Sequence, residues 1–218
     1  MTLPEPKTRA LATLRRITDA TRKLLADTGY DALSMRAIAA EAGVSPGAIY
    51  KHFSGKRELV DHVCRATLEA FETDLIKAIA PHPPGSFERV VAQGSEYMRL
   101  ALDKPEHFKI LFTAVKPVPT RLRDLPGEGG FRLLRECVAE AMEAGTIRKG
   151  DPELAAFFLW TRVHGIVTLM MACDFSDSLP LPRDEVTPHR LFDLSRTLLW
   201  EGFQPLGRKS KTGSRRRG

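Results

Sequence analysis

Cysteine is scarce in this chain of 218 residues, with only Cys64, Cys137 and Cys173. An odd number of widely spaced cysteines offers no disulfide framework, so we expect a protein of the reducing cytoplasm. The six histidines contain no His-x-x-x-His pair, and no Cys-x-x-Cys occurs. Because a bound metal needs closely spaced ligands of this kind, the sequence predicts no metal site.

Signatures of enzymes, export signals and membrane spans are missing as well. The glycine-rich stretch 127–130 is no phosphate loop, because no Gly-Lys-Ser/Thr follows it and no strand pattern precedes it. The N-terminus lacks an apolar run of about seven residues, which argues against a signal peptide. The most apolar window, 154–173, carries Arg162 and His164 near its centre, and an arginine at mid-bilayer costs about 2.5–3.5 kcal/mol. We expect no cofactor, no enzyme and no membrane partner, and a buried helix over this window.

Helical patterning fills the chain instead, without strand alternation to compete with it. Helix starts are marked by Ser86 and by the pairs Asp151-Pro152 and Thr187-Pro188. The sequence predicts an all-α protein of about nine helices, over residues 8–27, 34–42, 46–52, 56–79, 86–102, 131–143 and 188–200, with further helices beginning at 105 and 152. Loops are predicted over residues 117–130 and 174–185, and a disordered basic tail over 207–218.

The best-defined pair of helices lies over residues 34–52. Ser34 is placed to cap the first helix, and Gly43 stands where a helix ends in the left-handed conformation that glycine adopts cheaply. Ser45 is placed to cap the second helix, with Pro46 at its first position. The spacing therefore predicts two short helices joined by a tight turn.

The second of these helices has an apolar side and an outward side. Ile49 and Phe53, four residues apart, face inward. The outward side carries Gly47, Ala48, Tyr50 and Lys51. A helix-turn-helix of this shape can place its second helix in the major groove of DNA, where small residues let the backbone approach the base edges.

Residues 39–53 read Ala-Ala-Glu-Ala-Gly-Val-Ser-Pro-Gly-Ala-Ile-Tyr-Lys-His-Phe, and Lys56 follows. This segment closely resembles the helix-turn-helix of TetR-type transcriptional regulators, over roughly residues 10–60. The resemblance implies a three-helix DNA-binding domain over residues 1–56 and a helical effector-binding and dimerisation domain over residues 57–206. It also implies contacts with double-stranded operator DNA from Arg36, Ser45, Gly47, Ala48, Tyr50, Lys51, His52 and Lys56.

The resemblance divides these contacts between bases and phosphates. Phosphate contacts are implied for Tyr50, His52 and Lys56. Pro46 and Gly47 offer no side-chain hydrogen bonds, so base recognition has to depend on Arg36, Lys51 and the shape of the DNA. Two alternatives stay open: a helical ligand-binding or enzymatic protein with a merely structural helix pair, and a protein that coats DNA through its basic tail.

The charge distribution is compatible with a DNA-binding module at the N-terminus. Residues 1–60 hold ten lysines and arginines against six acidic residues, and residues 61–206 hold seventeen against twenty-one. The tail from Gly207 holds six basic residues and no acidic one. A basic segment attached to a mildly acidic body is typical of a DNA-binding domain fused to another domain.

Two helices near the C-terminus are apolar over more than one face, which predicts burial against a partner as well as the core. The first covers residues 154–173, and its segment Leu159-Trp-Thr-Arg-Val-His-Gly-Ile-Val167 resembles a Trp…His-Gly signature of one class of TetR-type C-terminal domains. The second carries Leu191, Phe192, Leu194, Leu198, Leu199 and Trp200. Pairing of both with their symmetry mates predicts a homodimer with two recognition helices about 34–36 Å apart.

A cavity between the helices of the larger domain is a candidate site for a small, apolar effector. Its predicted lining is Tyr97, Phe108, Phe112, Phe131, Met142, Trp160, His164 and Met170. Ordinary core packing remains the alternative for each of these side chains. His164 stands out because an ionisable residue in an apolar helix needs a buried partner or a ligand. The resemblance implies a repressor that binds a palindromic operator and is released by the effector.

Overall fold

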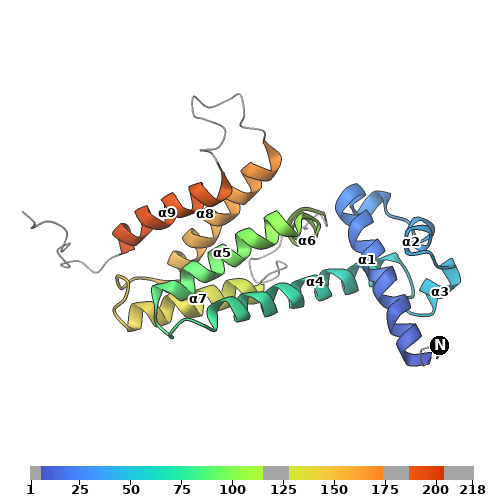
Figure 1. The fold of residues 1–218 in the computed structure, drawn as a ribbon, viewed down its shortest axis with the longest axis horizontal. Coiled ribbons are helices and arrows are strands. Elements are labelled where there is room, and N and C mark those ends of the chain that lie inside the picture. The colour runs from blue at the N-terminus through green and yellow to red at the C-terminus, as the bar shows by residue number, and fades with distance from the viewer. Residues whose placement is uncertain (1–5, 115–127, 174–186, 204–218) are drawn as a thin grey trace, which may run out of the picture. The chain divides into compact units, whose positions relative to one another are not determined.

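The computed structural model describes residues 6–114, 128–173 and 187–203, and every regular element in these ranges is helical. The predicted all-α class is therefore confirmed (Figure 1). The elements are α1 (Pro6–Ala32), α2 (Met35–Ala42), α3 (Pro46–Tyr50), α4 (Lys56–Ile79), α5 (Phe87–Asp103), α6 (Pro105–Lys109), the π-helical turn η1 (Ile110–Ala114), α7 (Glu128–Glu143), α8 (Pro152–Ala172) and α9 (Pro188–Phe203).

Two helices begin where a polar side chain accepts hydrogen bonds from the amides of the first turn. Asp151 Oδ1 accepts hydrogen bonds from the amides of Glu153 and Leu154 at 2.9 and 3.2 Å. Thr187 Oγ1 accepts from the amide of Arg190 at 3.2 Å. Both predicted caps are confirmed, because a short polar side chain next to a proline can satisfy first-turn N–H groups locally.

The regular part of α1 ends close to the predicted position, because Gly29 has the non-helical angles φ 75° and ψ 173°, and a short helical segment follows as far as Ala32. Two other boundary predictions were wrong. α3 ends at Tyr50, two residues early, and α7 begins at Glu128 inside the predicted loop. The rest of that loop, the predicted loop 174–185 and the basic tail lie outside the described residues.

The predicted capping role of Ser86 was also wrong. Helix α5 begins one residue later, at Phe87, as expected. The Ser86 Oγ is buried and has no hydrogen-bond partner within the described part of the chain. The first residue of α5, Phe87, is 7% exposed and packs in a hydrophobic core.

The described residues form two compact units. Unit 1 takes those of residues 1–76 and 99–130, and unit 2 takes those of residues 77–98 and 131–218. The resemblance implied a division at residue 56. Unit 1 also includes α6 and η1, because Ile110 is 2% exposed in the core that the N-terminal helices build.

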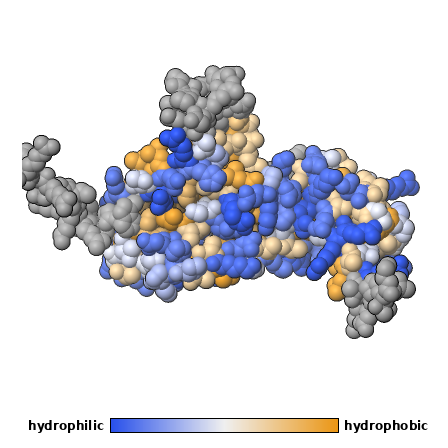
Figure 2. All heavy atoms as spheres, viewed as in Figure 1, coloured by the Kyte–Doolittle hydropathy of each residue, from blue (hydrophilic) through white to orange (hydrophobic). Residues whose placement is uncertain are grey.

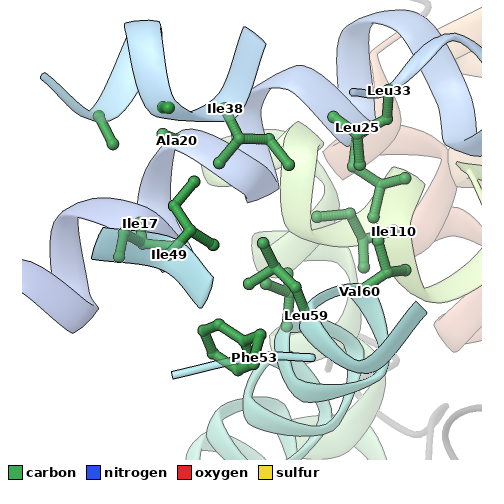
Figure 3. Packing of buried hydrophobic residues seen from close by; sticks show 13 residues of the cluster. Ile17, Ala20, Leu25, Leu33, Ile38, Ile49, Phe53, Leu59, Val60 and Ile110 are labelled. Atoms are coloured by element: carbon green, nitrogen blue, oxygen red, sulfur yellow. The ribbon is translucent and has the colours of Figure 1, made fainter. Parts of the chain in front are cut away.

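The core of unit 1 lies between α1, α2, α3 and the start of α4. Ile17, Ile38 and Ile49 each have no exposed surface, and Phe53 is 6% exposed. Figure 3 shows Ile38, Ile49 and Leu59 from three different helices gathered in this core. The predicted inward positions of Ile49 and Phe53 are therefore confirmed, and the short α3 is held by its buried side.

The core of unit 2 involves α5, α7, α8 and α9. Phe192 of α9 is 3% exposed and lies against Gly94 of α5, where a Cβ would come within 2.8 and 2.9 Å of two ring atoms. The Arg162 guanidinium lies over the same ring, 5.2 Å from its centroid, and donates to Ser195 Oγ. Burial lowers the pKa of Arg162 to about 10. One aromatic side chain thus joins three helices of the unit.

We expect Gly94→Ala to lower the free energy of unfolding by about 1–3 kcal/mol, the usual cost of overpacking a core. The cost arises because a phenyl ring enclosed by two helices cannot move aside as a flexible side chain would. Urea unfolding at fixed protein concentration measures the difference. Gly202→Ala is the matched control, since no atom from other parts of the described chain lies within 4 Å of its Cβ position. Equal stabilities for the two variants would contradict the close docking of Phe192.

Candidate functional site

The turn between α2 and α3 is built from local hydrogen bonds. Ser34 Oγ accepts from the amide of Ala37 at 3.1 Å and caps α2. At the other end Gly43 adopts the left-handed conformation, with φ 60° and ψ 42°. The amides of Gly43 and Val44 then donate to Ala40 O and Ala39 O at 3.1 and 3.0 Å. These bonds close α2 and turn the chain within two residues.

The N-terminus of α3 is capped as the sequence predicted. Ser45 Oγ accepts from the amide of Ala48 at 3.3 Å, and Pro46 occupies the first helical position. Its five residues hold few internal hydrogen bonds, so α3 depends on this cap and on the buried Ile49. The orientation of the helix is consequently set by the turn and the core rather than by its own length.

Most of the predicted DNA-contacting residues lie on the surface of unit 1. Tyr50 is 56% exposed at the end of α3. Ala48 is half-buried, so only part of its methyl group reaches the surface. The exposed members of the set are Arg36, Ser45, Gly47, Tyr50, Lys51 and His52. The arrangement therefore offers a small-residue helix surface bordered by a phenol and cations.

Lys56 differs from the other predicted contacts. Its Nζ donates to Tyr30 O at 2.9 Å and to Leu33 O at 3.0 Å, and lies 4.5 Å from the centroid of the Tyr30 ring. The ammonium thus ties the start of α4 to the connection between α1 and α2. The sequence could not indicate this role, because both acceptors are backbone carbonyls brought close only by folding.

In unit 2, the structure brings together three of the predicted effector-binding residues. The Tyr97 hydroxyl and His164 Nδ1 are 2.6 Å apart, and the Trp160 ring lies 5.9 Å from the His164 ring, centroid to centroid. Burial raises the pKa of Tyr97 and lowers that of His164, because both charged forms lose hydration. Tyr97 is 6% exposed. The cluster therefore presents a neutral polar pair within an aromatic environment.

The other five predicted effector-binding residues are dispersed. Phe131 contacts Trp160 with ring centroids 6.0 Å apart, so it extends the cluster. Met142, 7% exposed, packs in the core of unit 2. Phe108 and Phe112 belong to unit 1, where the centroids of their rings are 4.8 Å apart. Met170 is half-buried on α8.

Acid is expected to destabilise the protein through His164. Its folded-state pKa lies below the ordinary value of 6.5, so below about pH 6.5 the unfolded chain binds more protons and stability falls as the pH drops. His107 has a pKa shift of the same sign and adds to the loss. Between pH 7.5 and 5.5, the melting temperature should fall less for His164→Gln, whose side-chain amide can still hydrogen-bond to the Tyr97 hydroxyl, than for the wild type. An equal fall in the two proteins would contradict the role given to His164.

One face of α8 and α9 is apolar and exposed. α8 buries Ala156, Leu159, Val163 and Val167. The same helix exposes Leu154, Phe157, Phe158, Leu169 and Met171, and α9 exposes Leu194 and Leu198. Figure 2 shows hydrophobic residues gathered over these two helices. The length and apolarity of α8 alone would also suit a membrane span, but its buried side belongs to a protein core.

Two family models match this chain, one near the N-terminus and one over the C-terminal half. Residues 17–63 match a family model described as bacterial regulatory proteins of the tetR family. Residues 90–194 match a second one, described as a tetracyclin repressor-like C-terminal domain. The chain belongs to the TetR family. The matched families consist of regulators rather than enzymes, which agrees with the expectation from the sequence.

Curated relatives of this TetR-family chain match it over short stretches. The regulator UidR of Escherichia coli K12 is 35% identical over 57 residues, which cover 26% of this chain and 29% of UidR. The repressor KstR of Rhodococcus jostii RHA1 is 37% identical over 71 residues, covering 33% of this chain and 31% of KstR. The chain thus matches less than a third of the length of these relatives.

Solved structures match this TetR-family chain over a greater length. A structure titled AibR in complex with isovaleryl coenzyme A and operator DNA has a TM-score of 0.66 and 21% sequence identity. The match covers 86% of this chain and 98% of the AibR chain. At this identity the likeness establishes a shared fold across both units.

Proposed function

We propose that this protein is a DNA-binding transcriptional regulator that recognises an operator through α3. The observation that carries the proposal is the exposed outer side of α3, held by the Ser45 cap and the Gly43 turn. Gly47 lets the backbone approach the base edges, and Lys51 reaches beyond it. A helix of this kind fits the major groove.

The side chains around α3 divide into base and phosphate contacts in this proposal. Arg36 at the start of α2 and Lys51 after α3 contact base edges, because both are exposed and long. Tyr50 and His52 contact phosphates beside the groove. Lys56 supports the interface from within the domain, since its donors already reach Tyr30 O and Leu33 O.

Recognition of a palindromic operator requires two copies of this unit, and we assign the contact between copies to α8 and α9. Leu194 and Leu198, which are 57% and 61% exposed, lie one turn apart on α9. Exposed apolar rows on adjacent helices, which run in opposite directions in Figure 1, are suited to a four-helix contact between symmetry-related chains. Arg162 at the seam of these helices argues against a lipid-facing surface.

We further propose that the regulator is a cytoplasmic repressor released by a small apolar molecule. The relative KstR is named a repressor, and the matched AibR structure holds isovaleryl coenzyme A, which carries a short apolar acyl group. In this chain the Tyr97–His164 pair beside Trp160 is the proposed polar anchor for an effector. A coupling of about 1–3 kcal/mol between the effector and DNA sites is enough to empty an operator.

Selection of genomic fragments by the purified protein tests this function. We expect enrichment of inverted repeats, including one upstream of a neighbouring gene, and loss of the complex on adding acyl-coenzyme A compounds or free short-chain acids as candidate effectors. Expression from that promoter should rise when the gene for the regulator is deleted. Equal recovery of random and genomic fragments would refute sequence-specific regulation and favour a nonspecific DNA-coating protein.

A further inference from the structure

The guanidinium of Arg16, on α1, lies against the C-terminal end of α2. Its Nε donates to Ala42 O at 2.9 Å, and its Nη2 donates to both Ala42 O and Gly43 O. The last carbonyls of a helix lack partners within the helix and carry partial negative charge. A planar cation with several donors therefore satisfies both their hydrogen bonding and their electrostatics.

The acceptors lie where the helix-turn-helix changes direction. Gly43 is the left-handed residue of the turn, and Ser45, two residues later, caps α3. A Cβ at Gly43 would come within 3.2 Å of Arg16 Nη2, so the guanidinium fills the space beside the turn. One side chain thus connects α1 with the end of α2 and the start of α3.

We propose that Arg16 is a positioning residue for DNA binding, which fixes the orientation of α3 by holding the turn and does not contact phosphate. This inference rests on the DNA-binding function proposed above. Arg16 is an exposed arginine, and for such a residue a phosphate contact or a solvated side chain would be the first expectation. In the structure, however, the Nε and Nη2 of Arg16 donate to two carbonyls of its own chain.

Amide exchange in the absence of DNA tests the first half of this proposal. Hydrogen–deuterium exchange of full-length protein, followed by NMR, is compared for the wild type, Arg16→Met, Arg16→Lys and Arg15→Met. Arg15 is the matched control, because it is exposed and makes no hydrogen bond or ion pair within the described ranges. We expect the Gly43 and Val44 amides to exchange about tenfold faster in Arg16→Met, the effect of losing charge-assisted hydrogen bonds. Arg16→Lys should lie between, and Arg15→Met should match the wild type.

Affinity for DNA tests the second half, with a duplex that the wild-type protein has selected from a random library. Binding is measured at 10 °C between 50 and 200 mM NaCl, with circular dichroism of each variant as the check that it is folded. We expect Arg16→Met to bind about tenfold more weakly with an unchanged salt slope, and Arg16→Lys to recover part of the affinity. Loss of a phosphate contact would instead flatten the slope by about 0.9 per contact.

The outcomes separate this inference from the proposed function. A wild-type protein that selects no duplex refutes DNA binding, while the exchange data still report whether Arg16 holds the turn. Unchanged exchange in Arg16→Met overturns the inference. A flattened salt slope, or faster exchange with full affinity, overturns it as well.

Discussion

Lys51→Ala is expected to weaken binding of the selected operator about 100-fold while leaving the protein folded. The side chain is exposed beyond the end of α3, so its removal costs no core packing. A contact with a base edge is worth about 1–3 kcal/mol, and a symmetric dimer loses it twice. Fluorescence anisotropy with the labelled duplex measures the affinity.

Tyr50→Ala should weaken binding in the same direction, because the 56% exposed phenol is the proposed phosphate contact next to Lys51. Tyr50→Phe separates the hydroxyl from the ring, and its affinity should fall between the wild type and Tyr50→Ala. Lys149→Ala removes an equal charge from an exposed position in unit 2 and is expected to keep full affinity. If Lys51→Ala and Tyr50→Ala both bind as tightly as the wild type, α3 is not the recognition element.

The double substitution Leu194→Glu and Leu198→Glu is expected to convert the protein to a monomer and to lower operator affinity at least about 100-fold. Both leucines are exposed on α9, so the change leaves the core of unit 2 intact. Burying four carboxylates at a symmetric interface would be strongly unfavourable. A monomer reads one half-site and loses the effective concentration that links the two half-sites. Sedimentation velocity and anisotropy on the same samples measure both effects.

Ile76→Glu is the control for this pair of substitutions. Ile76 is an apolar side chain on α4 with 56% of its surface exposed, so its replacement adds an acidic group outside the proposed interface. We expect the dimer and the affinity to be retained. A dimer that survives the α9 substitutions would move the interface elsewhere, and a monomer with full affinity would show that the operator is not read by two copies.

Local features of this fold could be predicted from the sequence because they depend on neighbours in the chain. A cap needs only a short polar side chain within three residues of a free N–H, as at Ser34, Ser45 and Asp151. The turn at Gly43 needs only a residue that tolerates positive φ. The same rule failed at Ser86, whose Oγ is buried without a partner within the described residues.

The outward residues of α3 could also be predicted from the sequence, because their exposure depends on residues close to them in the chain. Exposure of Gly47, Tyr50 and Lys51 follows from helical periodicity once Ile49 and Phe53 are buried, so the pattern of apolar residues fixes the outer side of α3. Six of the eight residues proposed for the effector were chosen for apolar or aromatic character, and only Tyr97 and His164 for a polar group. Apolar character cannot distinguish a core methionine such as Met142 from a residue beside the Tyr97–His164 pair.

What the sequence by itself determined is the order of the helices, the caps at Ser34, Ser45, Asp151 and Thr187, and the outward residues of α3. Only the tertiary structure decided what the long cations do and which helices share a core. Arg16 and Lys56 bond to backbone carbonyls, and Ile110 joins a core formed mainly by residues 17–63. Every residue carries a carbonyl, so no side-chain pattern marks the acceptor. Packing between distant segments selects it, because a buried or helix-terminal carbonyl gains most from a charged donor.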